Sequence, residues 1–154
     1  MDRITKKKRL FLALIIVNIL FIWANSLLPG SISGAISGFV KDLVYKIFPG
    51  LSGSGEGGHG LLRKLGHFTE FACLGALLTR FLFLLQKPRL LAVAVAFLVG
   101  CCDETIQRFI PDRGPSFRDV LIDTAGATAG MILLLVGYAY CKRRKKQATE
   151  ENHQ

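Results

Sequence analysis

The sequence has few of the residues that build disulfide frameworks or zinc sites. It contains 4 cysteines among 154 residues, and no two of them are spaced as Cys-x-x-Cys. Cys73, Cys101 and Cys102 lie within apolar segments, where small buried residues are common. A disulfide scaffold or a zinc framework is therefore not expected. Acidic residues are also scarce, with 11 Asp and Glu against 20 Lys and Arg, so the positions of the few acids are informative.

The chain has no room for a separate soluble domain, because four long apolar segments fill most of its 154 residues. These segments cover about residues 10–28, 61–85, 88–109 and 117–140. Each is close to the roughly 20 residues with which an α-helix crosses a hydrocarbon layer about 30 Å thick. We therefore predict an all-α, polytopic membrane helix bundle with four transmembrane helices. It forms one transmembrane domain over residues 10–141, between a basic segment 1–9 and a basic, polar tail 142–154 that we expect to be disordered after Lys146.

The basic residues gather at one set of helix ends. Thirteen of the 20 Lys and Arg precede the first apolar segment, lie around the turn between the second and third, or follow the fourth. Because short cytoplasmic loops carry an excess of Lys and Arg, this distribution places both termini in the cytoplasm. It also accounts for the net charge of +9, so the basic composition gives no reason to expect nucleic-acid binding.

The loop at residues 29–60 lies on the outer side in this topology and has two parts. Apolar residues recur at helical spacing over 32–47, which predicts an amphipathic helix that is stopped by Pro49 and Gly50. This helix either lies in the membrane interface or covers the mouth of the bundle as a lid. Residues 51–60 are rich in Gly and Ser and are typical of a flexible tether.

The fourth apolar segment carries a surface of small residues. Gly126 and Gly130 are four residues apart, a spacing that allows another helix to approach closely. We expect the facing helix to be the segment 88–109, which contains Ala92 and Ala96. The same surface would suit a contact between two copies of the chain, so a homo-oligomer through Gly126 and Gly130 is the alternative.

Three of the apolar segments contain ionisable residues. His67, Asp103 and Asp123 each lie six residues from the outer end of a segment, or about 9 Å below it at 1.5 Å per residue. Glu70 shares a helix face with His67, and Gln107 shares one with Asp103. A charged group near mid-bilayer costs roughly 2.5–3.5 kcal/mol, so these residues are expected to face one another or water. We predict a polar layer to which three helices contribute.

The candidate site residues fall into two groups. His67 is the candidate for transferring or sensing a proton, with Glu70, Asp103 and Glu104 as acidic partners. Arg113 lies in the Pro- and Gly-rich loop before the fourth segment and is expected to bind an anion or to neutralise the acids. The residues predicted to bind a ligand are Ser26, Lys64, Gln107, Arg113, Ser116, Asp119 and Asp123.

A metal site is another interpretation of the same residues. His67 and Glu70 are spaced i, i+3, and with Asp103 and Glu104 they offer an imidazole and several carboxylates, groups that bind metals in helix bundles. However, only one histidine is near, and guanidinium groups such as that of Arg113 would compete with a cation. We therefore expect neither a metal ion nor another cofactor.

Three motifs resemble one known family. Lys-x-x-His-Phe-x-Glu-Phe, Asp-Glu-x-x-Gln-x-Phe-x-Pro-x-Arg and Asp-Val-x-x-Asp-x-x-Gly occur in this order, after the segment ANSLLPG. Over about residues 15–137 the chain is similar to the VanZ-like family of small bacterial membrane proteins. The resemblance implies a multi-pass protein of the bacterial plasma membrane. The family is named after a protein that lowers susceptibility to teicoplanin, a glycopeptide antibiotic, so an effect on antibiotic susceptibility is one expectation.

Three functions are compatible with the sequence. The first is an outer-leaflet polar pocket that binds a lipid-linked or cell-wall-related group, with membrane lipids or an envelope precursor as the partner. The second is an enzyme that acts on a lipid head group with His67 as acid and base. The third is a structural membrane module whose polar network only fixes the packing of its helices.

Overall fold

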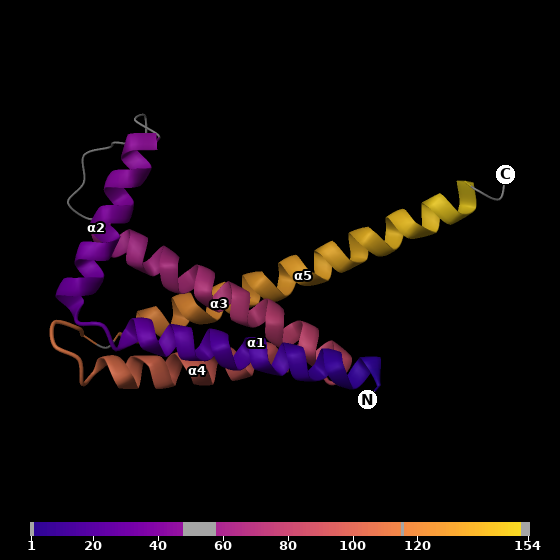
Figure 1. Cartoon of the computed structure of the whole chain (residues 1–154), viewed down its shortest axis with the longest axis horizontal. Coiled ribbons are helices and arrows are strands. Elements are labelled where there is room, and N and C mark those ends of the chain that lie inside the picture. Colours follow the sequence, from indigo (N-terminus) through magenta and orange to yellow (C-terminus); the bar gives the residue numbers. More distant parts are fainter. Residues whose placement is uncertain (1, 48–57, 115, 152–154) are drawn as a thin grey trace.

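The computed structural model describes residues 2–47, 58–114 and 116–151, and its regular structure is helical (Figure 1). The helices are α1 (Arg3–Ser26), α2 (Gly30–Ile47), α3 (Gly58–Leu84), α4 (Leu91–Gln107) and α5 (Phe117–Glu151). α1 runs beside α4, while α5 crosses α3 and its C-terminal part projects away from the other helices (Figure 1). No strand occurs among the described residues, which confirms the all-α prediction.

Three of these helices are long and apolar enough to cross a membrane. They are α1, the part of α3 from Leu62 to Leu84, and the part of α5 from Phe117 to Thr149. α4 contains 17 residues and is about 26 Å long at 1.5 Å per residue. That length is slightly below a hydrocarbon layer of about 30 Å. The fold is that of a helical membrane protein with three candidate spans, and α4 is the shortest helix of the bundle.

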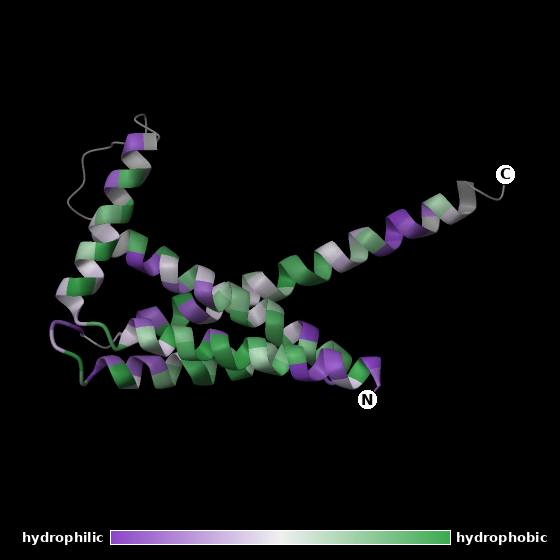
Figure 2. Ribbon diagram, in the orientation of Figure 1, coloured by the Kyte–Doolittle hydropathy of each residue, from purple (hydrophilic) through white to green (hydrophobic). Residues whose placement is uncertain are grey.

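The outer surface of the bundle is apolar. Figure 2 shows hydrophobic residues along most of α1 and α4, with hydrophilic residues at the N-terminal end of α1. Val17, Leu20, Leu98 and Leu133 are each 57% to 70% exposed. A soluble protein rarely exposes apolar surface on this scale. These side chains are suited to contact with lipid tails.

The most extensive helix contact is between α3 and α5. A Cβ atom at Gly126 would overlap the backbone carbonyl of Phe68, and one at Gly130 would overlap the backbone carbonyl of Ala72. The two helices can approach so closely only because these positions have no side chain. The prediction that Gly126 and Gly130 face the segment 88–109 is therefore wrong, because α3 occupies this surface within the same chain. Residue spacing identifies a helix face, but not the helix that lies opposite.

α2 is inclined to the bundle and lies beside the N-terminal half of α3 (Figure 1). Its first residue is held by the loop after α4, since the Gly30 N–H donates a hydrogen bond to the Pro111 carbonyl at 3.2 Å. The sequence prediction of a helix in this loop is confirmed. Residues 51–57 of the predicted tether lie outside the described residues, whereas Gly58 already belongs to α3.

α5 continues beyond the fourth apolar segment as far as Glu151. The predicted disorder after Lys146 is therefore wrong for residues 147–151, and residues 152–154 lie outside the described part of the chain. No glycine or proline follows Gly137, so the tail contains no residue that would end the helix.

Candidate functional site

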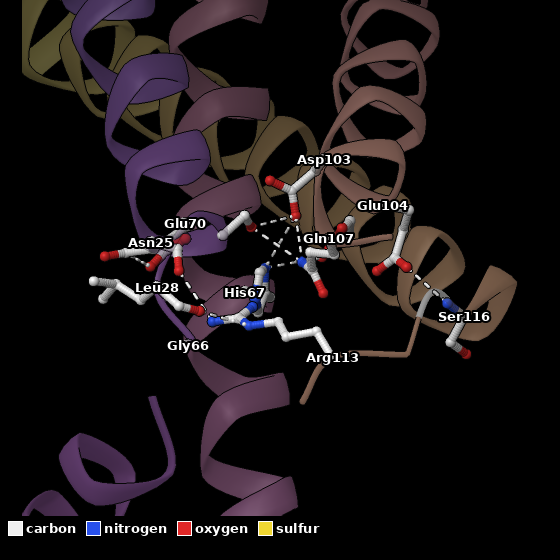
Figure 3. Close-up of polar contacts among 12 residues, drawn as sticks. Asn25, Leu28, Gly66, His67, Glu70, Asp103, Glu104, Gln107, Arg113 and Ser116 are labelled. Atoms are coloured by element: carbon white, nitrogen blue, oxygen red, sulfur yellow. Dashed lines mark hydrogen bonds and ion pairs between the residues drawn. The ribbon is translucent and has the colours of Figure 1, made fainter. Parts of the chain in front are cut away.

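Asp103 is the centre of a buried hydrogen-bond network between α1 and α4. Ser26 Oγ donates to Asp103 Oδ2 at 2.7 Å, and Gln107 Nε2 donates to the same oxygen at 2.8 Å (Figure 3). Gln107 Nε2 also donates to Ser26 Oγ at 3.0 Å. All three side chains are buried. Because Ser26 ends α1 and the other two residues are one turn apart on α4, a single turn of each helix is enough to build the network.

His67 of α3 lies between two buried carboxylates. Its Nδ1 atom is 4.0 Å from Asp103 Oδ2 and 3.9 Å from Asp123 Oδ1. Both distances exceed the usual range of about 2.7–3.2 Å for an N–H···O hydrogen bond. Within the described part of the chain, neither oxygen of Asp123 has a hydrogen-bond partner, and Asp103 Oδ1 has none either. The structure thus brings one predicted site residue from each of α3, α4 and α5 to the same point.

Glu70 lies one turn from His67 and contacts α1 instead of the buried carboxylates. Asn25 Nδ2 donates a hydrogen bond to Glu70 Oε1 at 2.7 Å (Figure 3). Asn25 was not among the predicted site residues. The available signal was its position immediately before Ser26, as a second polar residue at the end of an apolar segment.

Glu104 faces the start of α5. Its Oε2 atom accepts a hydrogen bond from the backbone N–H of Ser116 at 2.7 Å (Figure 3). Ser116 immediately precedes the first residue of α5, so the carboxylate lies at a helix N-terminus, where negative charge is favourable. Glu104 and Ser116 therefore connect α4 to α5, and neither of them contacts His67 through a hydrogen bond.

Arg113 binds the C-terminal end of α1. Its Nε atom donates to the Leu28 carbonyl and its Nη2 atom donates to the Asn25 carbonyl, both at 3.0 Å (Figure 3). A cation at this end of a helix also interacts favourably with the helix dipole. Burial lowers the pKa of the Arg113 guanidinium, and the charge of Arg63 lowers it further, but an arginine side chain remains protonated.

A cavity of about 250 Å³ lies among α1, α2, α3 and the loop after α4. Its ionisable lining residues are Arg63, His67, Glu70 and Arg113, and apolar side chains come from α2, α3 and the segment between α1 and α2. We call this space the headgroup cavity. Among the described residues, no carboxylate oxygen lies within 4.0 Å of a nitrogen of Arg63 or Arg113. Two guanidinium groups therefore line one cavity without a direct ionic partner.

A smaller space of about 10 Å³ adjoins His67. Lys64, Asp119 and Asp123 line it, together with Glu104 and Gln107. The predicted ligand residue Lys64 lines this small space and not the headgroup cavity, whereas its neighbour Arg63 lines both. Sequence reasoning did not select Arg63 as a ligand-binding residue, although its i, i+4 spacing with His67 was the available signal.

A third cavity, of about 500 Å³, lies toward the opposite end of α3. Its lining residues include Thr79, Phe83, Leu133 and Tyr138, together with Arg80 and Arg89. None of the described residues that line it is acidic or a histidine. Its larger volume therefore does not make it the better candidate, because it lacks the converging polar groups that orient a ligand.

Comparison with known proteins identifies one family. A family model described as VanZ/LLP1 matches residues 10–138. This range contains all of α2, α3 and α4, and α1 from Leu10 onward. No match was found among curated proteins or among solved structures. The three motifs that carry the resemblance include His67, Asp103 and Asp123, the residues that meet between α3, α4 and α5. The chain belongs to the VanZ-like family.

Proposed function

We propose that the protein is an integral membrane protein of the bacterial cell envelope whose headgroup cavity binds the anionic group of a lipid-linked or cell-wall-related molecule. The observation that supports this most is the placement of Arg63 and Arg113 on one cavity without an ionic partner among the described residues. Guanidinium groups bind phosphate and carboxylate strongly and with defined geometry. An anion in the cavity would therefore supply the missing counter-charge.

The size and lining of the cavity favour a head group over a whole lipid. A volume of about 250 Å³ is below the roughly 300–1,000 Å³ of most small-molecule pockets, so a lipid tail would remain outside. Leu28, Ile36 and Val40 supply apolar surface beside the charged wall. A molecule with an anionic group next to an apolar chain matches this combination.

The proposed topology places the cavity in the outer leaflet. α1, α3, α4 and α5 each cross the membrane, α2 lies in the interface, and both termini are cytoplasmic because the basic residues gather at those helix ends. The headgroup cavity is lined by Leu28 of the segment that joins α1 to α2, and this segment lies at the other end of the bundle from the N-terminus (Figure 1). An envelope precursor or lipid displayed on the outer face would reach it directly.

Within this function, the anion is held by Arg63 and by Arg113 Nη1, the Arg113 nitrogen without a hydrogen-bond partner among the described residues, and Glu70 with Asn25 forms the polar wall on the α1 side. This assignment replaces Lys64, which lines the smaller space. An effect on susceptibility to glycopeptide antibiotics such as teicoplanin, which the family resemblance implies, would follow if the bound molecule is part of the cell-wall surface that these antibiotics meet.

The test compares substitutions of two adjacent basic residues, Arg63 and Lys64. We expect protein purified gently from its own membrane to retain an anionic lipid or precursor that mass spectrometry detects, and Arg63→Ala to lose it. Lys64→Ala is the matched control, because it removes one positive charge from the same helix turn without altering the headgroup cavity. Equal retention by both variants, or no retained anion in the wild type, would contradict the proposal.

An enzymatic role is a second candidate because His67 lines both the headgroup cavity and the small space beside the buried carboxylates. An imidazole in this position could transfer a proton to or from a bound head group. Conversion of the retained molecule by wild-type protein, but not by His67→Ala that still retains it, would distinguish turnover from binding. If neither binding nor turnover depends on these residues, the network serves only helix packing.

A further inference from the structure

We propose that His67, Asp103 and Asp123 bind a divalent transition-metal ion. Each residue comes from a different helix, and one ligand atom from each lies within 4.8 Å of the other two. Ligands that converge from separate helices into a bundle core are the usual way in which helical proteins hold metals. The proposal goes beyond anion binding and does not depend on it.

The two carboxylates are only partly compensated within the described part of the chain. Asp103 and Asp123 are 0% and 1% exposed, and among the described residues three of their four oxygens have no hydrogen-bond donor, whereas Asp103 Oδ2 has two. Among the described residues, no Lys or Arg nitrogen lies within 4.0 Å of either carboxylate. A buried carboxylate without a partner is strongly destabilising. A bound dication would neutralise both groups at once.

The three ligand atoms converge on one point without a hydrogen bond between His67 and either carboxylate. His67 Nδ1 lies 4.0 Å and 3.9 Å from the nearest oxygens of Asp103 and Asp123, which is too far for a hydrogen bond. Nitrogen and oxygen ligands lie about 2.0–2.2 Å from zinc, so two ligands of a tetrahedral ion are about 3.4 Å apart. The three ligand atoms here are separated by up to 4.8 Å, so a bound ion would have to draw the three side chains closer together.

Neighbouring side chains hold one ligand in place. Ser26 Oγ and Gln107 Nε2 both donate to Asp103 Oδ2, the carboxylate oxygen that lies 4.0 Å from His67 Nδ1, and this fixes the carboxylate beside His67. Hydrogen bonds of this kind to a ligating carboxylate are a regular part of metal sites. The space of about 10 Å³ beside His67 and Asp123 is sufficient for about one water, which could occupy an open coordination position.

The structure also answers the objection that the guanidinium group of Arg113 would compete with a metal ion. Arg113 is committed to the carbonyls of α1 through Nε and Nη2, so it does not compete for the carboxylates by hydrogen bonding. Glu70 and Glu104, which the sequence suggested as metal ligands, form hydrogen bonds elsewhere. Asp123 is the second carboxylate ligand in their place. An imidazole with two carboxylates favours a transition metal such as Zn²⁺ or Mn²⁺ over Mg²⁺ or Ca²⁺, which prefer oxygen ligands alone.

The test is direct metal binding by the full chain, purified in detergent through a tag without histidines. After treatment with EDTA, the protein is dialysed against Zn²⁺ or Mn²⁺ and its metal content is measured by mass spectrometry. We expect about one equivalent of ion in the wild type and its loss in Asp123→Asn, which preserves the side-chain volume. Asp119→Asn is the matched control, since Asp119 lines the adjoining small space but lies outside the three-ligand group, and it should retain the ion.

Thermal unfolding gives a second measurement that does not require any variant. The melting temperature of the wild type should rise in Zn²⁺ or Mn²⁺, fall again with EDTA, and respond less to Mg²⁺, because an ion that binds only the folded state stabilises it. The proposal is overturned if wild type and Asp123→Asn bind equal amounts of metal, or if no stoichiometric ion binds. Arg63→Ala should keep the ion, so failure of anion binding and failure of metal binding can be told apart.

Discussion

The contact between α3 and α5 and the contact between α1 and α4 are built in opposite ways. In the first, Gly75, Gly126 and Gly130 bring backbone directly against backbone. In the second, Ser26 and Asp103 meet through buried polar side chains. Backbone packing tolerates no added atom, whereas a hydrogen-bond network can lose one member and keep its shape. The α3–α5 contact therefore fixes how these helices are placed, and the α1–α4 contact provides buried polar groups of the candidate site.

The largest effect should come from enlarging a glycine in the α3–α5 contact. A side chain in Gly130→Val would overlap the backbone of Ala72, so the helices must separate, and we expect a loss of about 3 kcal/mol of stability. Membrane abundance and thermal unfolding in detergent would measure it. Gly137→Ala is the matched control, because a Cβ at Gly137 meets nothing within 4 Å. Similar behaviour of the two variants would mean that α3 and α5 do not pack in this way.

A smaller loss should follow from Arg113→Ala. The substitution removes the two charged hydrogen bonds at the C-terminal end of α1, each of a kind that contributes about 1.5–3 kcal/mol when measured singly. Since Arg113 is only half-buried, we expect about 2 kcal/mol in total. Thermal unfolding beside Arg108→Ala, which alters an exposed arginine nearby, provides the measurement. An unchanged midpoint would show that Arg113 does not secure α1.

The smallest of these effects should come from Ser26→Ala in the α1–α4 contact. Asp103 Oδ2 loses one of its two donors but keeps Gln107, so a loss of about 1 kcal/mol is expected. Thr69→Ala, which removes an exposed hydroxyl bonded only within its own helix, is the reference for unfolding measurements. If Ser26→Ala lost as much stability as Gly130→Val, the α1–α4 contact would be no more tolerant of substitution than the α3–α5 contact.

The sequence predicted the helices and the polar layer well because both depend on local pattern. Apolar length located α1, α3 and α5, and residue spacing placed His67 and Asp103 at one depth. What it did not predict depends on how each helix is rotated. Arg63 and Lys64 are adjacent in sequence, yet only Arg63 lines the headgroup cavity, and this follows from the packing of α3 against α1 and α2.

The sequence also did not determine which helix or which group each residue contacts. The spacing of Gly126 and Gly130 correctly indicated a close approach, but α3 lies opposite instead of α4. Arg113 was expected to meet acids or an anion, whereas two of its donors bind carbonyl oxygens of Asn25 and Leu28. Backbone carbonyls at a helix end have no sequence signature of their own, so such a contact is visible only in the folded chain.

The shortness of α4 has a consequence for the lipid around it. On the proposed topology, a helix of 17 residues is about 4 Å shorter than the hydrocarbon layer it would cross. Hydrophobic mismatch of this sign is relieved when the bilayer thins beside the helix. Thinning next to α4 would lower the lipid–water boundary toward Asp103 and Gln107, and the protein would then shape the membrane at the place where its polar residues are most deeply buried.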